Sequence, residues 1–179
     1  PIYRFIRAPG YGQLTLTIGK YYRVTGGSTQ HRGVIPDIEL PSLVDTNTVG
    51  ESTRDTALPW DQIDPTRFRA ETSLDPAIQL LTARHTARAA NDPDYNYLLA
   101  DVAAFGKLRE RETVSLNLLE RQAERNLLQE QQLTRENERR AALELEPLAS
   151  IDEFEATESS DVQLDQAARV VADMAALDA

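Results

Sequence analysis

The period of the hydrophobic pattern changes near residue 74, and this change limits the folds that are open to the chain. Residues 13–24 alternate apolar and polar side chains, which predicts a strand with one buried face. Residues 34–40 form a second short apolar run, and Gly26-Gly27 between the two runs indicates a tight turn. From residue 74 the apolar residues recur at helical spacing. We therefore expect an α+β chain, with a short β-hairpin followed by a mainly helical part.

The helical part contains recognisable start signals. Asp75-Pro76 and Asp92-Pro93 each offer a capping carboxylate followed by proline at the first helical position. A longer helix is expected from about 117 to 145, with Asn117 and Glu120 at capping-box spacing. An acidic linker over 150–161 should separate it from a last helix that begins near Asp161.

Two of these helices have distinctive surfaces. The 117–145 segment mixes Glu and Arg three or four residues apart, and its apolar positions do not sustain a heptad repeat. We interpret it as a solvated helix with one side docked on a neighbour. The last helix is amphipathic, and its apolar face is made by Leu164, Ala168, Val171 and Ala175.

Charge and composition exclude several classes of protein. The 179 residues carry a net charge of −10, and from residue 150 onward eight acidic residues accompany a single arginine, Arg169. Such a surface repels phosphate backbones, so we expect no nucleic-acid partner. No apolar run reaches the length of a membrane-spanning helix. The chain has no cysteine, which excludes disulfides and thiolate metal sites.

The residues offer little for catalysis. Ser28 and Lys20 could form a Ser/Lys pair, in which a neutral lysine takes the serine proton. Ser28, however, lies in a Gly-Gly-Ser turn where small polar residues are common, and no apolar pocket is visible around Lys20. His31 and His85 lack the spacing of metal ligands. We expect no catalytic residue, no metal site and no cofactor site.

One aromatic residue stands out in the long polar connector that follows the hairpin. Trp60, in the stretch "ALPWD" (57–61), is the single tryptophan of the chain. We interpret it as a packing anchor rather than a platform for a ligand. From the residues alone, the chain reads as a non-catalytic interaction or scaffolding piece.

The hairpin stretch resembles a known family. "GQLTLTIGKYYRVTGGSTQHRGVIPDIELP" (12–41) is similar to the segment that follows the catalytic lysine in carboxy-terminal processing peptidases. The shared elements are the Leu-Thr…Tyr-Tyr strand, the Gly-Ser-Thr-Gln turn and the Gly-Val-x-Pro-Asp ending. Arg23, Gly26-Gly27, "ALPWD" and "VSLN" (114–117) indicate the tail-specific protease branch. The resemblance extends over nearly the whole chain.

This resemblance implies a periplasmic serine endopeptidase as the parent protein, with a PDZ domain that binds exposed C-terminal tails. Its serine nucleophile and lysine base would lie upstream of this segment. Lys107, in "FGKLRE", matches the Phe-Gly-Lys context of the family's lysine but falls in a helix after the hairpin and lacks the following glycine. No catalytic residue can therefore be transferred to this chain, which we expect to be inactive alone.

The resemblance also implies a division of the chain. Residues 1–42 would be the C-terminal strands of the peptidase core, residues 43–73 a connector, and residues 74–179 a helical C-terminal domain. Expected partners are unfolded or tail-exposed protein substrates through the parent enzyme, and an adaptor protein on the helical domain. The alternative from another class is a free-standing helical adaptor or scaffold whose hairpin edge docks a partner strand.

Overall fold

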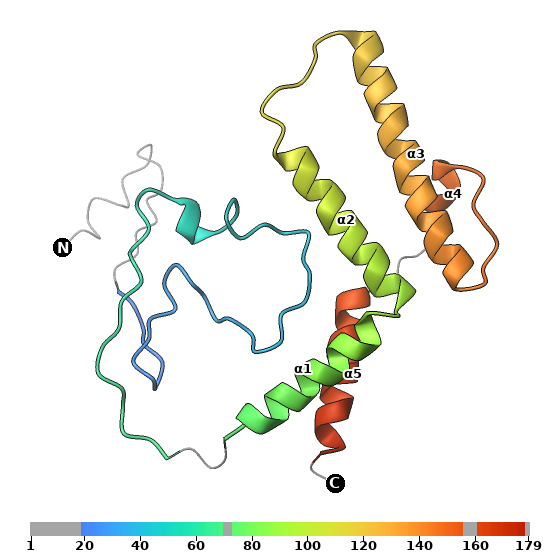
Figure 1. The fold of residues 1–179 in the computed structure, drawn as a ribbon. Coiled ribbons are helices and arrows are strands. Elements are labelled where there is room, and N and C mark those ends of the chain that lie inside the picture. The colour runs from blue at the N-terminus through green and yellow to red at the C-terminus, as the bar shows by residue number, and fades with distance from the viewer. Residues whose placement is uncertain (1–18, 70–72, 156–160, 178–179) are drawn as a thin grey trace, which may run out of the picture. The chain divides into compact units, whose positions relative to one another are not determined.

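The computed structural model describes residues 19–69, 73–155 and 161–177 (Figure 1). These residues fall into two compact units. The first unit contains the described residues of the spans Pro1–Pro36 and Asp45–Glu71, and the helical unit contains those of Asp37–Val44 and Thr72–Ala179.

The first unit contains isolated bridges in place of the expected hairpin. Its described backbone forms a short 3₁₀-helix, η2 (Glu51–Thr53), and two antiparallel bridges, Tyr22 with Ser28 and Gly27 with Gln62. The expected strand over 34–40 is not formed, and residues 13–18 of the other strand lie outside the described residues. A strand needs a continuous neighbour for its amides and carbonyls, and Pro36 has no amide to offer.

The helical unit confirms the mainly helical expectation. Its helices are α1 (Asp75–Ala89), α2 (Pro93–Arg109), α3 (Leu118–Ala142), α4 (Ile151–Glu155) and α5 (Val162–Ala175). Helix α5 packs against α1 and α2, α2 packs against α3, and α4 packs against α3 (Figure 1). The short α4 falls within the stretch 150–161 that we expected to be only a linker.

Side-chain caps explain where three of the helices begin. Asp92 caps α2, and its Oδ1 accepts hydrogen bonds from the backbone of Asp94 at 3.0 Å and Tyr95 at 3.2 Å. Asn117 caps α3 and Asp161 caps α5 in the same way. Helix α1 differs from the expectation, because it begins at Asp75 itself and its N-cap residue makes no side-chain hydrogen bond.

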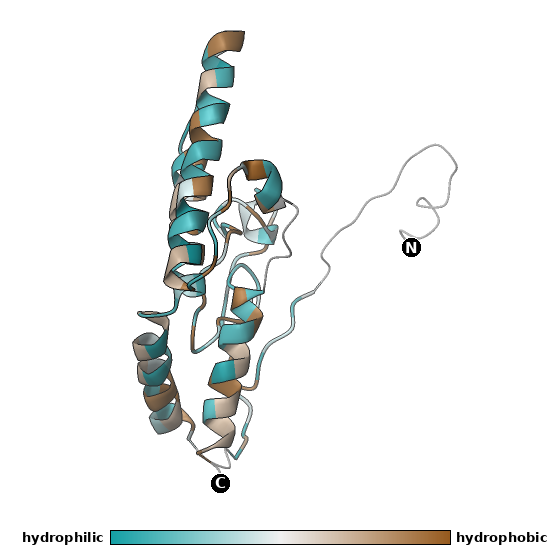
Figure 2. Cartoon of the chain, turned by 90° about the vertical axis from the view of Figure 1, so that its right-hand side faces the viewer, coloured by the Kyte–Doolittle hydropathy of each residue, from teal (hydrophilic) through white to brown (hydrophobic). Residues whose placement is uncertain are grey.

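The helices are joined around very little buried apolar surface. Among the described residues, Leu81 and Ala89 are the buried apolar side chains. The polar residues His85, Glu136 and Gln166 are as deeply buried. Several large apolar side chains of the helices are exposed, among them Leu119, Leu127 and Leu164. Figure 2 shows hydrophobic and hydrophilic residues following one another along the helices. None of the helices in the described ranges is long and apolar enough to cross a membrane.

Candidate functional site

In the first unit, backbone hydrogen bonds join residues 24–28 to residues 61–66, and we call this arrangement the Trp60 clasp. The amide of Ser28 donates to the carbonyl of Asp61 at 3.0 Å, and the amide of Ile63 donates to the carbonyl of Gly26 at 2.9 Å. The amide of Thr66 donates to the carbonyl of Val24, also at 2.9 Å. These bonds join segments that are far apart in the sequence.

Gly26 allows the two backbones of the clasp to approach. Its φ of 85° lies in the left-handed region, and a Cβ atom there would stand 2.0 Å from the carbonyl oxygen of Ile63. Only glycine fits such a position without strain. The glycine pair therefore serves this close approach as well as the turn predicted from the sequence.

The structure places Lys20 and Ser28 in this region but gives each a different partner. The Lys20 Nζ donates to the carbonyl of Pro59 at 2.6 Å and forms an ion pair with Asp61 Oδ1 at 3.2 Å. Ser28 is buried, and its Oγ accepts from the amide of Gln30 at 2.9 Å. Within the described residues no hydrogen bond joins Lys20 to Ser28.

Asp61 also binds a tyrosine. The Tyr22 hydroxyl donates to Asp61 Oδ2 at 3.1 Å. This hydrogen bond stabilises the neutral phenol, and together with burial and the charge of Asp61 it raises the pKa of Tyr22. Asp61 thus connects Lys20 and Tyr22 to the backbone of the clasp.

Trp60 has an arginine as a neighbour in the first unit. The guanidinium of Arg32 lies 4.0 Å from the centre of its ring, which is cation–π geometry. A Cβ on Gly27 would stand 3.8 Å from the same ring, at ordinary contact distance. The contact with Arg32 is made within the chain, and the role of Trp60 as a packing anchor stays a prediction.

The other residues singled out in the sequence are divided between the two units. His31 is exposed in the first unit, whereas His85 is buried in α1, where its ring meets that of Tyr95 edge-on at 5.5 Å. Across the part of the chain that the structure describes, no group of three or more His, Asp or Glu side chains could hold a metal ion. Lys107 is exposed in the last turn of α2. A positive charge is favourable there because the C-terminal end of a helix carries the negative end of its dipole.

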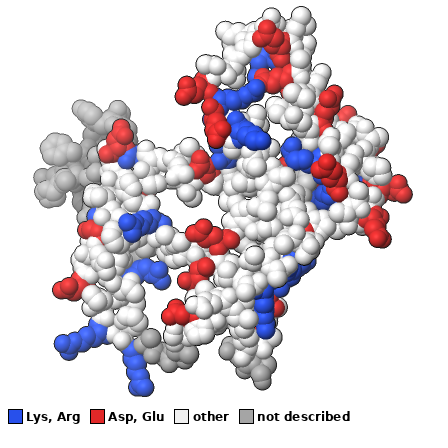
Figure 3. Space-filling view, in the orientation of Figure 1, with Lys and Arg blue, Asp and Glu red and all other residues white. Residues whose placement is uncertain are grey.

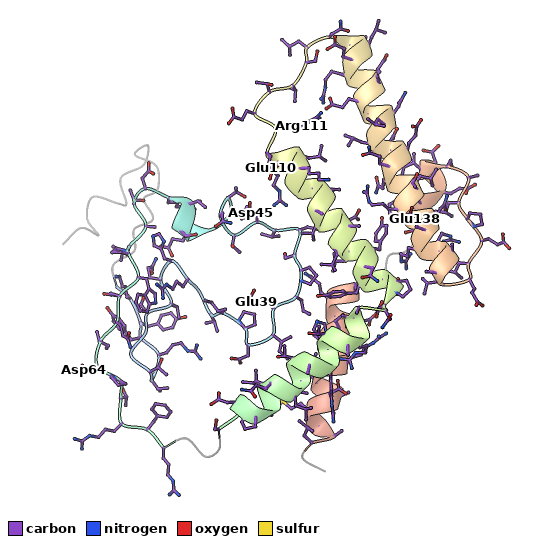
Figure 4. All side chains as sticks on the ribbon, in the orientation of Figure 1. Glu39, Asp45, Asp64, Glu110, Arg111 and Glu138 are labelled. Carbon is purple, nitrogen blue, oxygen red and sulfur yellow. The ribbon has the colours of Figure 1, made fainter. Side chains whose placement is uncertain are left out.

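Two grooves in the helical unit were not anticipated from the sequence. The first, of about 340 Å³, lies between residues 37–39 and helices α1 and α2, with His85 and Tyr95 in its lining. Glu39, labelled in Figure 4, is exposed at this groove. The second, of about 380 Å³, lies between α2 and α3 and includes Glu138. Each groove is lined by residues from separate segments of the chain, and the local sequence pattern does not predict which segments meet.

Arginine–carboxylate pairs join α2 to α3. Arg135 donates from Nε and Nη2 to Asp101 Oδ1, at 3.1 and 2.9 Å. Arg139 donates to Asp94 Oδ1 at 2.6 Å and to Glu136 Oε1 at 2.9 Å. The Glu136 side chain is only 2% exposed, and its charged partners are Arg139 and Arg140, whose Nη1 atoms lie 2.9 and 3.9 Å from its Oε1.

Tyr97 lies beside this network, under the guanidinium of Arg139 at 5.8 Å. Burial raises the pKa of Tyr97 to about 12, and the charges of Asp101 and Glu136 act in the same direction. The phenol therefore stays neutral at any physiological pH.

Polar contacts also attach α5 to α1 and α2. Gln166 Nε2 and Arg169 Nη1 donate to Asp92 Oδ2, at 2.8 and 3.0 Å. Arg88 Nη1 donates to Asp173 Oδ2 at 2.8 Å. Figure 3 shows Lys and Arg side chains interspersed with Asp and Glu on the visible face of the helices. These contacts hold α5 against α1 and α2.

Sequence comparison relates the chain to known proteins. The family model for the C-terminal domain of tail specific protease matches residues 44–176. A tail-specific protease of Haemophilus influenzae is 35% identical over 176 residues, which cover 96% of this chain and 25% of that protein. The chain thus spans about a quarter of the length of this curated relative.

Proposed function

The chain belongs to the family of C-terminal domains of tail-specific proteases, and from that premise we propose that it is the structural C-terminal part of a serine endopeptidase. The parent enzyme degrades proteins that it recognises by their C-terminal tails. This segment completes the core sheet and supplies the helical domain, while the catalytic serine and lysine lie upstream. The observation that carries the proposal is the alignment of almost the whole chain with a quarter of the Haemophilus protease.

The proposed division is residues 1–42 as core strands, 43–73 as connector and 74–179 as helical domain. The Trp60 clasp supports a role for the first part in a sheet, because its backbone bonds follow an antiparallel pattern. We attribute the missing hairpin to missing neighbours, since Val34 and Ile35 stay 63% and 62% exposed. In the parent enzyme these residues would gain a partner strand.

The helical domain has a proposed part in selecting substrates. Helices that border the proteolytic chamber would admit extended chains and exclude folded proteins without recognising particular side chains. An adaptor protein on the helices, and a periplasmic location, are also part of the proposal and rest on the family resemblance. Few apolar side chains are buried between these helices, which supports a surface-lining element rather than an independent enzyme.

The test uses an unfolded fluorogenic protein that the full-length parent degrades. The chain alone should release no fluorescence, because it has no nucleophile with its base. Ser28→Ala and Lys20→Met should leave that null result unchanged. Activity of the chain that either substitution abolishes would contradict the assignment of the catalytic pair to the upstream region.

The coding sequence upstream of Pro1 distinguishes the proposal from the free-standing adaptor. A PDZ domain and a Ser…Lys pair encoded there would support the protease. An initiator methionine at the start of the expected hairpin would favour the adaptor.

A further inference from the structure

Residues 37–44, which we call the strap, belong to the helical unit, although the chain on either side of them belongs to the first unit. The exposure of the apolar side chains changes where the strap begins. Val34 and Ile35 are 63% and 62% exposed, whereas Ile38 and Leu40 are partly buried. The strap is therefore covered by the helical unit, and the residues just before it are not.

The strap lies on the helices without forming a helix of its own. Its side chains alternate, because Asp37 and Glu39 are exposed and Ile38 is partly buried. Ile38 lines the groove of about 340 Å³ together with residues of α1 and α2. The proline at position 41 disfavours a helical conformation of Leu40. The two carboxylates thus stay in water while an apolar side chain contacts the helices.

Two side chains from the helices hold the strap by its backbone. Gln163, in the first turn of α5, donates from Nε2 to the carbonyl of Pro41 at 2.5 Å. Arg109, at the end of α2, donates from Nη2 to the carbonyl of Leu43. Both acceptors are main-chain carbonyl oxygens, so these contacts fix the path of the backbone.

The attachment of the strap is confined to the surface of the helical unit. Gln163 and Arg109 are both exposed. Within the described residues, the amides of Ile38, Glu39 and Leu40 make no hydrogen bond. Opening the strap would break the two side-chain bonds and leave the backbone bonds of the helices intact. A segment with so few buried contacts opens locally at a low cost in free energy.

We propose that the strap is a releasable latch, which fastens the chain of the first unit to the helical unit and opens without unfolding the helices. When it is closed, the chain is held between Pro36 and Asp45 as well as joined near residues 71–72. Opening removes Ile38 from one side of the groove that also contains His85. The latch does not depend on the proteolytic role of the longer protein. With the strap on the helices, the part of the proposed core strands that stays with the first unit ends at Pro36.

Limited proteolysis of the full chain with a glutamate-specific protease tests the latch. Glu39 lies in the strap, and Glu112 lies in the exposed connection between α2 and α3. Each cleavage rate is divided by the rate for a synthetic peptide of the same local sequence. Cleavage after Glu39 should then be about tenfold slower than cleavage after Glu112, because only the open latch is cut.

Removing one donor should open the latch and leave the helices folded. Gln163→Ala should raise the rate after Glu39 about fivefold, the effect of one lost hydrogen bond, and leave the rate after Glu112 unchanged. Arg109→Ala should act in the same direction. Helical circular dichroism should not change in either variant. The matched control is Gln131→Ala, an exposed glutamine of α3, which should alter neither rate.

Engineered cysteines test the position of the strap, because the chain has none of its own. In the double variant Pro41→Cys with Gln163→Cys, a short bismaleimide should join the two thiols within one chain, as measured by mass spectrometry. The control pair, Pro41→Cys with Gln131→Cys, should not be joined. Adding Ile38→Asp to the first pair should reduce the joined fraction, because a carboxylate is unfavourable against the helices.

Four results would overturn the proposal. The first is equal normalised cleavage after Glu39 and Glu112, which would mean that the strap is not held. The second is cleavage after Glu39 that neither Gln163→Ala nor Arg109→Ala accelerates. The third is a loss of helical circular dichroism whenever cleavage is accelerated, because the strap would then open only with the helices. The fourth is equal cross-linking of the two cysteine pairs.

Discussion

Each of the two units is stabilised internally by a different kind of contact. In the first unit, the Trp60 clasp joins backbone to backbone, and its closest approach needs glycine. In the helical unit, arginine–carboxylate pairs and a helix cap connect helices whose buried apolar side chains are few. The clasp therefore depends on backbone geometry at one point, and the helices depend on particular polar partners. Substitutions can test this contrast directly.

Gly26→Ala should have the largest effect, and should act on the first unit. The new Cβ would meet the Ile63 carbonyl at 2.0 Å with φ at 85°, so we expect a local loss of about 3 kcal/mol. Urea unfolding followed by the fluorescence of Trp60 measures it, because the chain has one tryptophan.

The matched control is Gly19→Ala, where a Cβ would meet no atom within 4 Å. It should change the free energy of unfolding by less than about 0.5 kcal/mol. Helical circular dichroism should be unaffected by either substitution. An unchanged Trp60 transition in Gly26→Ala would show that the clasp does not need glycine.

Asp92→Ala should have the next largest effect, and should act on the helical unit. It removes the cap of α2 and leaves the buried Gln166 amide without its acceptor, which together should reduce stability by about 2 kcal/mol. Thermal unfolding followed by circular dichroism measures the loss.

Asp75→Ala is the control, since Asp75 precedes a proline in the same way but caps no helix. Its effect should stay below about 1 kcal/mol. Equal losses from the two substitutions would mean that neither the cap of α2 nor the contacts of α5 with Asp92 contribute to stability.

Tyr97 should give the smallest effect, and only in alkali. Its pKa is raised from 10.0 to about 12 by burial and by the charges of Asp101 and Glu136, so the unfolded chain loses this proton first. The contribution is fully present below about pH 10 and is lost between about pH 10 and 12. Because the side chain is only partly buried, we expect less than about 1 kcal/mol at pH 11.

Urea unfolding measures this contribution when it is compared at about pH 9 and pH 11, in the unsubstituted chain and in Tyr97→Phe. The phenylalanine variant should lose less stability in alkali. Tyr22 provides the contrast in the first unit, because a hydrogen bond to Asp61 is the main cause of its raised pKa. Asp61→Asn should therefore change the alkaline titration of Tyr22 and leave that of Tyr97 unaltered. If the free energy of unfolding depends on pH in the same way in Tyr97→Phe and in the unsubstituted chain, the alkaline loss does not come from Tyr97.

Local signals explain how much of the helical unit could be predicted. The caps at Asp92, Asn117 and Asp161 act within a few residues, and all three begin helices as the sequence indicated. Asp75 was the exception, because its helix begins one residue earlier than the pattern predicts. The expected hairpin needs a neighbouring strand for its backbone hydrogen bonds. The alternation of apolar and polar residues does not show whether such a strand is present.

The orientation of α5 shows a second limit of local patterns. The spacing from Leu164 to Ala175 identifies an apolar face, but it does not say whether that face is turned inward. Arg88 and Asp92 decide the question, and both lie far from α5 in the sequence. The groove beside residues 37–39 was missed for the same reason, since its lining comes from segments separated along the chain.

The attachment of α5 to α1 also has a consequence in time. Arg88 and Asp173 are separated by 85 positions, and Asp92 and Gln166 by 74. During synthesis, α1 and α2 leave the ribosome well before the helix that binds them. Arg88 and Asp92 remain in water until α5 has been synthesised. Helices α1 and α2 therefore lack these contacts while the rest of the helical unit is translated. A nascent chain of this kind is most exposed to chaperones and to degradation in that interval.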